Sequence, residues 1–524
     1  MTARQLVLRA LAYYWRSNLA VVAGVATAVA VLAGALLVGD SVRGSLSDLV
    51  LQRIGRADAV VTSTGFFREA LADEMIHGTD AASKYQAAAP LIVLQGVVGD
   101  PASGRRVSQA AVYGVDDRFW AFHGVDRRGP SDRDAFVSRA LAEDLGVAPG
   151  AAVLVRIARP TAIPIDSLHG SKEDPGRSVR LTVRDVLDAA QMGDFSIQPS
   201  QGRVRAIFVP LARLQQDLDR AGRVNAVIVA GDPASFRPVF DATLERAARP
   251  EDYGLKVRSL EAQHAVALES DSGLLDFART SAANAAADVV QLPATPVLTY
   301  LANTLRSGDR EVPYSLVTAT DLARIAPQAA ASDPSHPPIV INEWTAQDLG
   351  AKPGDPLTLE FYVWQEPGYL ETRTAEFRIA AVVPIADGAA DRDLAPDYPG
   401  ITEADTLGDW DPPFPIDLKR VRPKDEDYWK QYRTTPKAFI PYEEGRRIWG
   451  SPRYGDRTSI RIHPLAWQPL DEAARQFSGA LMLSLKPAAG GFAVMDVRGR
   501  GLAASRGSTD FGEYFLYFSF FLVV

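Results

Sequence analysis

Side chains that could do chemistry are sparse in this sequence, and their spacing matches no catalytic motif. The 524 residues contain no Cys, which excludes disulfides, thiolate metal sites and a cysteine nucleophile. Six His residues are scattered along the chain, with no pair at helical metal-ligand spacing. Asp271 and Asp276 flank Ser272, but a serine and carboxylates without a nearby base do not make a triad.

An acidic run is the sequence's best candidate for a cation site. Its members are Asp391, Asp393, Asp397, Asp405, Asp409 and Asp411. Calcium loops need the D-x-D-x-D-G spacing, which this run lacks, so we expect a solvated loop. The P-loop, G-x-S-x-G and H-E-x-x-H motifs are also absent. The sequence therefore predicts a protein that is not itself an enzyme and that holds no cofactor and no metal.

Charge is distributed unevenly along the chain. The 56 Lys and Arg against 64 Asp and Glu give a net charge of −8, which argues against a nucleic-acid partner. Residues 1–18 nevertheless carry three arginines and no acid, and residues 19–39 carry no charge at all. A helix of that apolar length spans roughly 30 Å, the thickness of a bilayer's hydrocarbon core.

Residues 19–39 have three possible interpretations: a retained transmembrane helix, a cleaved signal peptide, or a buried helix of a soluble protein. The apolar core of a signal peptide has about 7–15 residues, and this run is longer. We therefore expect a transmembrane helix. The arginines ahead of it predict a cytoplasmic N-terminus and an extracytoplasmic location for residues 40–510.

The segments around this span suggest contact with lipid and with another helix. Residues 1–18 are predicted to form a cytoplasmic amphipathic leader on membrane lipid, with interfacial aromatic side chains at Tyr13, Tyr14 and Trp15. Small residues recur every four positions at Ala20, Gly24 and Ala28. Such a seam lets a second transmembrane helix approach closely, which favours a multi-helix bundle.

The C-terminal residues repeat the membrane signal. Residues 514–524 contain no charge and are dense in aromatics, but they are too few to cross a bilayer. We expect that the sequence is a fragment and that residues 511–524 begin a second transmembrane helix. The alternative is a buried C-terminal strand or helix.

An internal repeat divides the soluble part of the chain. Residues 137–157 align without gaps on residues 341–361. Each copy is predicted to form a short helix, a left-handed glycine cap, a Pro-Gly turn and a strand. The shared turn residues are Gly146, Pro149 and Gly150 in one copy, and Gly350, Pro353 and Gly354 in the other.

The repeat predicts an α+β protein with two related external modules, at residues 40–285 and 286–510. RAIFVPLARL (205–214) also resembles KAFIPYEEGRRI (437–448). RVNAVIVAG (223–231) is apolar enough for a central strand. Residues 66–76 have helical periodicity, residues 385–437 are predicted to be an irregular loop or arm, and GRGLAASRG (499–507) a linker.

Three segments together resemble one family of transporters. They are LLVGDSVRGSLSDLVLQRIGRADAVVTSTGFF (36–67), the two DLG-x-x-PG repeats, and STDFGEYFLYFSFFLVV (508–524). The plan of leader, span, external domain and second span is similar to that of MacB/FtsX-type ABC transporter permeases. The resemblance implies a MacB-like periplasmic core, a bacterial inner-membrane location and a permease dimer. It also implies a separate cytoplasmic ABC ATPase, whose motion the permease transmits to the periplasmic side in export or extraction.

Two other function classes stay open on sequence alone. One is a signal-anchored extracytoplasmic binding module without transport activity, and the other is a periplasmic hydrolase whose site escapes motif searching. The transmembrane seam favours the permease over the anchored module, and the sparse His residues disfavour the hydrolase.

Overall fold

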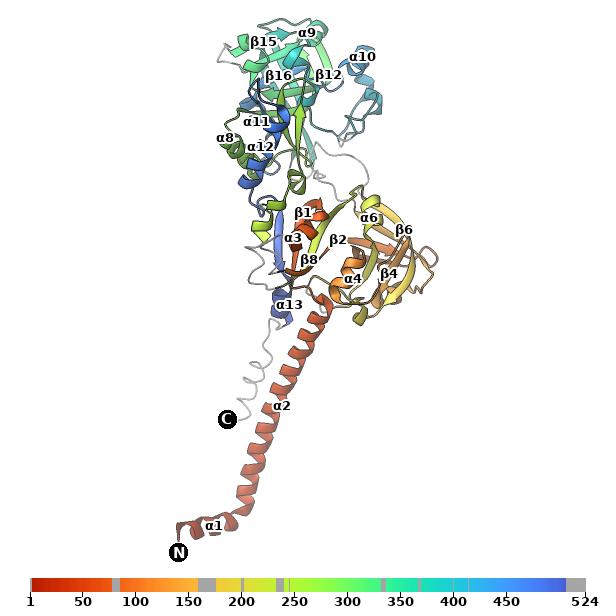
Figure 1. The fold of residues 1–524 in the computed structure, drawn as a ribbon, viewed down its shortest axis with the longest axis vertical. Coiled ribbons are helices and arrows are strands. Elements are labelled where there is room, and N and C mark those ends of the chain that lie inside the picture. Colours follow the sequence, from red (N-terminus) through yellow and green to blue (C-terminus); the bar gives the residue numbers. More distant parts are fainter. Residues whose placement is uncertain are drawn as a thin grey trace.

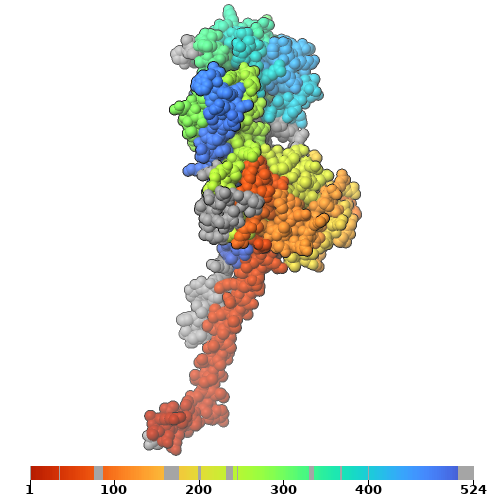
Figure 2. Space-filling view, in the orientation of Figure 1, coloured from red at the N-terminus to blue at the C-terminus, as the bar shows by residue number. Residues whose placement is uncertain are grey.

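The computed structural model describes residues 2–77, 85–158, 176–198, 202–231, 240–244, 246–330, 336–365, 369–398, 400–412 and 414–505. A long helix leads into a β-rich body, and a second β-rich body lies beyond the first (Figure 1). The space-filling view shows the same succession along one axis (Figure 2). The predicted residues 511–524 lie outside the described part of the chain.

The N-terminal residues form two helices that meet at an angle. Helix α1 (Ala3–Tyr13) and helix α2 (Trp15–Ile54) are separated by Tyr14, whose φ of −98° and ψ of 24° interrupt the helix. Among the described residues, α2 is the one helix that is long and apolar enough to cross a membrane. The structure thus agrees with the prediction of one N-terminal candidate membrane helix.

Helix α2 does not end where its apolar segment ends. It continues past Asp40 and Arg43 to Ile54, about 22 Å beyond residue 39 at 1.5 Å per residue. Charged residues fix where a helix leaves the hydrocarbon, but they are compatible with helical backbone. The helix stops at Gly55, whose φ is +62°. The apolar segment and the residues that lead into the first β-rich body therefore belong to one continuous helix.

The first β-rich body, which we call the proximal module, contains nine described strands in the order β18-β1-β8-β2-β3-β7-β4-β6-β5. Because β2 pairs with β3 and also with β5, the strands from β2 to β5 close into a six-stranded barrel. The strands are β1 (Ala59–Arg68), β2 (Tyr85–Gly99), β3 (Arg106–Val115), β4 (Asp134–Ser138), β5 (Ala152–Ala158), β6 (Gly176–Leu187), β7 (Ala206–Pro210), β8 (Arg223–Gly231) and β18 (Phe492–Asp496). Its helices include α3 (Ala70–His77), α4 (Asp117–His123), α5 (Arg139–Leu145), α6 (Leu211–Asp217) and α13 (Val497–Ser505).

The second body, the distal module, contains nine described strands in the order β9-β10-β17-β11-β14-β15-β13-β16-β12. Here β11 pairs with both β12 and β14 and closes the same kind of barrel. The strands are β9 (Leu255–Leu260), β10 (Ala265–Ser270), β11 (Ala294–Ser307), β12 (Arg310–Thr320), β13 (Pro338–Asn342), β14 (Pro356–Gln365), β15 (Tyr369–Val383), β16 (Ala438–Pro441) and β17 (Ser459–Ile462). Its helices include α8 (Phe277–Val289), α9 (Glu343–Leu349), α10 (Pro423–Tyr432), α11 (Tyr442–Trp449) and α12 (Leu470–Ser484).

The two modules have the same topology. Strands β1 to β8 correspond in order to β10 to β17, and corresponding pairs have the same direction; for example, β3–β7 and β12–β16 are both parallel. The mixed α+β class is confirmed. The predicted boundary at residue 285 falls inside α8, and β9 and β10 ahead of it pair within the distal sheet. The distal repeat begins at β10, whereas the similarity between the two repeats is recognisable in the sequence only further along, at residues 341–361. The boundary predicted from that similarity therefore lies too late in the chain.

The modules exchange their ninth strand. Strand β9 follows β8 in the chain but pairs with β10 of the distal module, where Ala265 lies opposite Leu260. Strand β18 follows β17 but pairs with β1 of the proximal module, where Ala59 lies opposite Asp496. Each module is therefore completed by the strand that follows the other module.

One apolar core runs through this exchange. Phe67 and Phe492 of the proximal sheet belong to the same buried cluster as Val266 of β10 and Phe477 of α12. Residues that are hundreds of positions apart thus share one core, so the modules cannot separate fully without exposing it.

Two local predictions differ from the structure. In the segment 66–76, the first residues belong to β1, and the helix begins only at Ala70. The predicted linker at 499–507 is helical up to Ser505, the last described residue, as part of α13. Gly501 permits close packing on α2, and this tertiary contact outweighs the low helix propensity of glycine. The predicted central strand at 223–231 is confirmed as β8, between β1 and β2.

The acidic run is not a solvated loop throughout. Asp391 is buried and accepts hydrogen bonds from Gln263 and from the backbone N–H of Asp393. It also lies 4.0 Å from the buried guanidinium of Arg461. Residues after it pack on the distal barrel through an apolar cluster that includes Tyr398 and Trp410. The predicted irregular arm at 385–437 is largely without regular structure, but it also contains helix α10, and the shared apolar cluster holds it against the barrel.

The repeated glycine turns have the expected conformation. Gly146 after α5 and Gly350 after α9 have φ of +73° and +61°. Gly150 and Gly354 follow with φ of +94° and +97°, and each donates 2.7 Å hydrogen bonds to the neighbouring strand, at Val183 and Ile379. Pro149 and Pro353 are exposed in these turns. The residue type at each capping position is therefore set by backbone geometry.

Replacement of either capping glycine by valine is expected to lower the free energy of unfolding by at least about 1 kcal/mol, because a β-branched residue resists positive φ. Thermal unfolding of Gly146→Val and Gly350→Val in detergent measures this loss. Ala148→Val, at an exposed neighbouring position, is the control. Unchanged stability of both glycine variants would contradict the structural equivalence of the turns.

Candidate functional site at the base of the proximal module

The end of α2 is held by several segments of the proximal module. The backbone N–H of Arg56 donates to His123 Nδ1 at 3.3 Å, just past the Gly55 cap. The Arg53 guanidinium donates to the Gly202 carbonyl at 2.8 Å, and the Arg53 carbonyl accepts from the Ser196 N–H at 3.2 Å. A side chain at position 55 would collide with His123. The helix therefore enters the module through a tightly packed socket.

Helix α13 packs along the last turns of α2 (Figure 1). At Gly501 an added Cβ would lie 2.6 Å from Val50 and 2.9 Å from Ile54, so the two helices are in direct contact there. The hydroxyl groups of Ser47 and Ser505 are 2.9 Å apart and form a hydrogen bond. The glycine thus allows close approach, and the serine pair fixes the register of the two helices.

Asp58 connects three segments at the base of the proximal module: the end of α2, the start of α13 and the end of β8. Its carboxylate forms an ion pair with Arg498 and accepts the Gly231 N–H at 2.9 Å. Its carbonyl accepts the N–H groups of Val497 and Arg498 at 3.1 and 3.2 Å. Arg498 also donates to the Gly55 carbonyl at 3.0 Å. These contacts bind the end of α2, the start of α13 and the end of β8 into one unit.

The strand exchange explains why α13 lies next to the end of α2. Because β18 pairs with β1, the chain returns from the distal module to the end of α2. Had the strand after β17 stayed in the distal sheet, the following residues would lie at the far body (Figure 1). Because of the exchange, the segments before and after the two modules meet at the base of the proximal module.

His123 lies buried inside this socket. Its ring contacts Phe119 and Phe195, with centroids 4.8 and 5.4 Å apart. Burial, and secondarily the charge of Arg56, lower the pKa of His123 from 6.5 to about 3. The ring is therefore neutral at physiological pH, which suits its role as hydrogen-bond acceptor for Arg56.

Stability is expected to fall as the pH drops from about 6.5 towards about 3, because the unfolded chain takes up the His123 proton before the folded chain does. The contribution of the neutral ring is fully present above the unfolded pKa. His123→Asn, which keeps an acceptor near the Nδ1 position, should be less stable at about pH 7 but lose less stability between about pH 7 and about pH 5. Chemical denaturation at both pH values tests this. An equal loss in native and variant proteins would refute the assignment.

The sequence-predicted site residues do not gather at this base. Tyr13, Tyr14 and Trp15 lie exposed at the corner between α1 and α2, where the rings of Tyr13 and Tyr14 contact edge to face at 4.9 Å. Ala20 and Gly24 are exposed and Ala28 is partly buried, and no described atom from elsewhere in the chain comes within 4 Å of a Cβ built at Gly24. The glycine turns lie elsewhere in the two modules.

Sequence reasoning missed the residues that form the base. Asp58 and Arg498 are single charged residues 440 positions apart, and nothing local links them. The small residues around Gly501 were a usable signal, because small residues also mark close helix packing. Their glycine content and lack of a strand-to-helix context instead predict a linker.

Several solved structures are similar to part of this chain. No family model and no curated protein matches the chain. The periplasmic region of MacB from Actinobacillus actinomycetemcomitans matches with 11% identity and a TM-score of 0.22, covering 37% of this chain and 83% of that one. The extracellular domain of the noncanonic ABC-type transporter YknZ from Gram-positive bacteria matches with 10% identity and a TM-score of 0.23, covering 36% and 90%. A domain of a putative permease protein from Porphyromonas gingivalis matches with 13% identity and a TM-score of 0.22, covering 37% and 82%. The β-rich region is thus similar to MacB-like periplasmic domains.

Proposed function

We propose that this chain is a permease subunit of an ABC-type export or extraction system, in which it transmits ATPase-driven motion from the membrane to the external modules. The observation that carries the proposal is the continuity of α2 from its apolar segment into the socket around Gly55. A helix is stiff along its axis, and a rigid element clamped at one end moves what it is clamped to.

The contacts at the base and the strand exchange connect α2 to the distal module as well. Asp58 ties α2 to α13, and β18 and β9 join the proximal and distal cores. A tilt of α2 would therefore displace both modules. The resemblance of the sequence to MacB/FtsX-type permeases supports the same role.

The proposal includes a location and partners. The N-terminus lies in the cytoplasm of a bacterial cell, α2 crosses the inner membrane, and the modules are extracytoplasmic. Hydrolysis of ATP takes place in a separate ABC ATPase subunit, and this chain is not itself catalytic. The permease acts as a dimer in lipid, and the face formed by Ala20, Gly24 and Ala28 contacts a neighbouring transmembrane helix.

A substitution on this face tests the function. In full-length permease reconstituted with an ABC ATPase encoded by a neighbouring gene, Gly24→Leu is expected to abolish the permease-dependent change in ATP hydrolysis while the external modules stay folded. Added bulk at the seam separates helices that must approach closely. Val25→Leu, an exposed apolar position on the same helix, is the matched control. Normal coupling in Gly24→Leu would contradict the seam. The absence of any coupling in the native protein would instead favour a signal-anchored binding module.

A further inference from the structure

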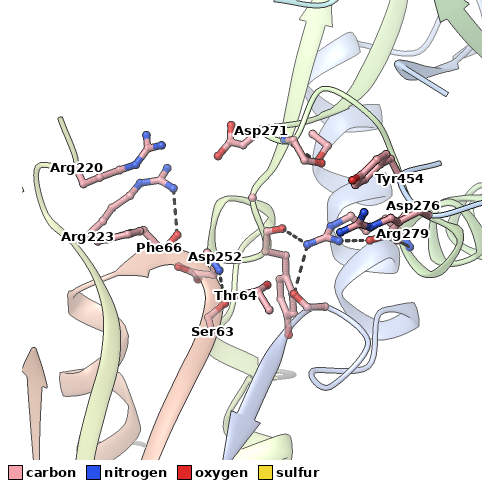
Figure 3. Close-up of a pocket in the computed structure, with 17 residues that line it drawn as sticks. Ser63, Thr64, Phe66, Arg220, Arg223, Asp252, Asp271, Asp276, Arg279 and Tyr454 are labelled. Atoms are coloured by element: carbon pink, nitrogen blue, oxygen red, sulfur yellow. Dashed lines mark hydrogen bonds and ion pairs between the residues drawn. The ribbon is translucent and has the colours of Figure 1, made fainter. Parts of the chain in front are cut away.

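A cleft of about 270 Å³ lies where the two modules meet. The proximal wall is the part of β1 from Ser63 to Phe66, and the distal wall includes the turn from Ser270 to Ser272 (Figure 3). Tyr253 and Gly490, on the two crossing segments that lead into β9 and β18, complete the lining. The cleft thus touches both modules and both connections between them.

Two arginines of the proximal module point into this cleft. Arg223 begins β8 and Arg220 lies in the loop just before it, with their guanidinium groups turned to the same space (Figure 3). Arg223 donates to the carbonyls of Phe66 and Glu251 at 3.5 and 3.3 Å. Within the described part of the chain, neither arginine forms an ion pair with a carboxylate. Two like charges side by side without a counter-charge raise the local positive potential.

The carboxylates around the cleft are each paired with another cation. Asp252 binds Arg68 at 2.8 Å, and Asp276 pairs with Arg279. Asp271 on the facing wall binds Lys256 at 3.2 Å. These side chains therefore do not compensate Arg220 and Arg223, although Asp271 still opposes an incoming anion.

The remaining lining suits an oxyanion. Thr64 lines the cleft with a hydroxyl group, and Arg453 adds a third guanidinium from the distal module. The Ser270 hydroxyl also lies in the lining, where it is hydrogen-bonded to the Ser272 hydroxyl at 2.8 Å. Guanidinium groups bind phosphate through paired, charge-assisted hydrogen bonds. We propose that the cleft binds an anionic group of the phosphate type, free or carried on a lipid headgroup, between the two modules.

Calorimetry on residues 1–524 in neutral detergent tests the site, and it does not depend on the transport role because no ATPase is needed. Inorganic phosphate and dihexanoyl phosphatidylglycerol are the two probes, which distinguish the free from the lipid source. We expect saturable binding of at least one. Arg220→Gln/Arg223→Gln should weaken it at least about tenfold through loss of charge-assisted hydrogen bonds. Arg133→Gln/Arg475→Gln, at two exposed positions, removes the same charge and should leave binding unchanged.

A second variant is needed because Arg220→Gln/Arg223→Gln could lose binding through misfolding. Asp271→Asn removes the opposing negative charge and is expected to tighten binding of the same probe. The alternative is that Asp271 forms ion pairs with the two arginines and closes the cleft, in which case the native chain would bind neither probe. The proposal is overturned if neither probe binds, if both arginine pairs weaken binding equally, or if Asp271→Asn weakens it.

Discussion

Phe492→Ala is expected to lower the free energy of unfolding by about 3–5 kcal/mol, the cost of deleting a large buried aromatic side chain. Phe492 is 4% exposed and begins β18, the strand that the distal repeat contributes to the proximal sheet. Its ring contacts Phe67 at 5.2 Å and Tyr253 at 5.3 Å between centroids. Because Tyr253 precedes β9 and Phe492 begins β18, the Phe492 side chain packs where both exchanged strands start.

Thermal unfolding of the detergent-solubilised chain measures the loss, and hydrogen exchange locates it. We expect faster exchange in β18 and α13 of the variant, because both depend on this anchor. Phe277→Ala is the matched control, since Phe277 is 86% exposed and its replacement should change stability by less than about 0.5 kcal/mol. Equal effects of the two substitutions would show that the exchanged strand does not hold the modules together.

Asp58→Ala is expected to cost about 2–4 kcal/mol, because in a partly buried site it leaves the Gly231 N–H without its acceptor and the Arg498 guanidinium without its carboxylate partner. The side chains of Asp58 and Arg498 are 18% and 32% exposed. The loss should appear as early unfolding of α13 and of the last turns of α2.

An exposed ion pair provides the control for Asp58. Glu143 and Arg203 form an ion pair whose side chains are 53% and 57% exposed. Solvent screens exposed pairs of this kind, so Glu143→Ala should have little effect on stability. If Asp58→Ala costs no more than Glu143→Ala, the base does not clamp α2 to the proximal module.

What could be predicted from the sequence rests on local patterns. The apolar run in α2, the glycine caps at Gly146 and Gly350 and the strand β8 each depend on residues within one short window. Hydrophobic period, left-handed glycine and continuous apolar runs identify such elements without knowledge of their neighbours. The same logic identified the tandem repeat.

What could not be predicted depends on pairing across the chain. Strands β9 and β18 have equivalent places in the two sheets, so exchanged and unexchanged pairings satisfy the same local pattern. The burial of Asp391 needs Arg461, 70 positions away, and the helix at Gly501 needs the α2 surface. Likewise, Asp58 and Arg498 acquire a role only because β18 returns the chain to the base.

The measurement that tests the central claim most directly is the distance between the distal modules of a reconstituted permease dimer, with and without ATP. The chain has no Cys, so Leu483→Cys on α12, 77% exposed, gives one spin label per copy without background. A label pair at Ser45→Cys on α2 and Arg133→Cys on the proximal module reports on the base within one copy. The account predicts an ATP-dependent change of several ångströms between the Leu483 labels and none between Ser45 and Arg133. Unchanged Leu483 distances while the ATPase turns over would contradict it.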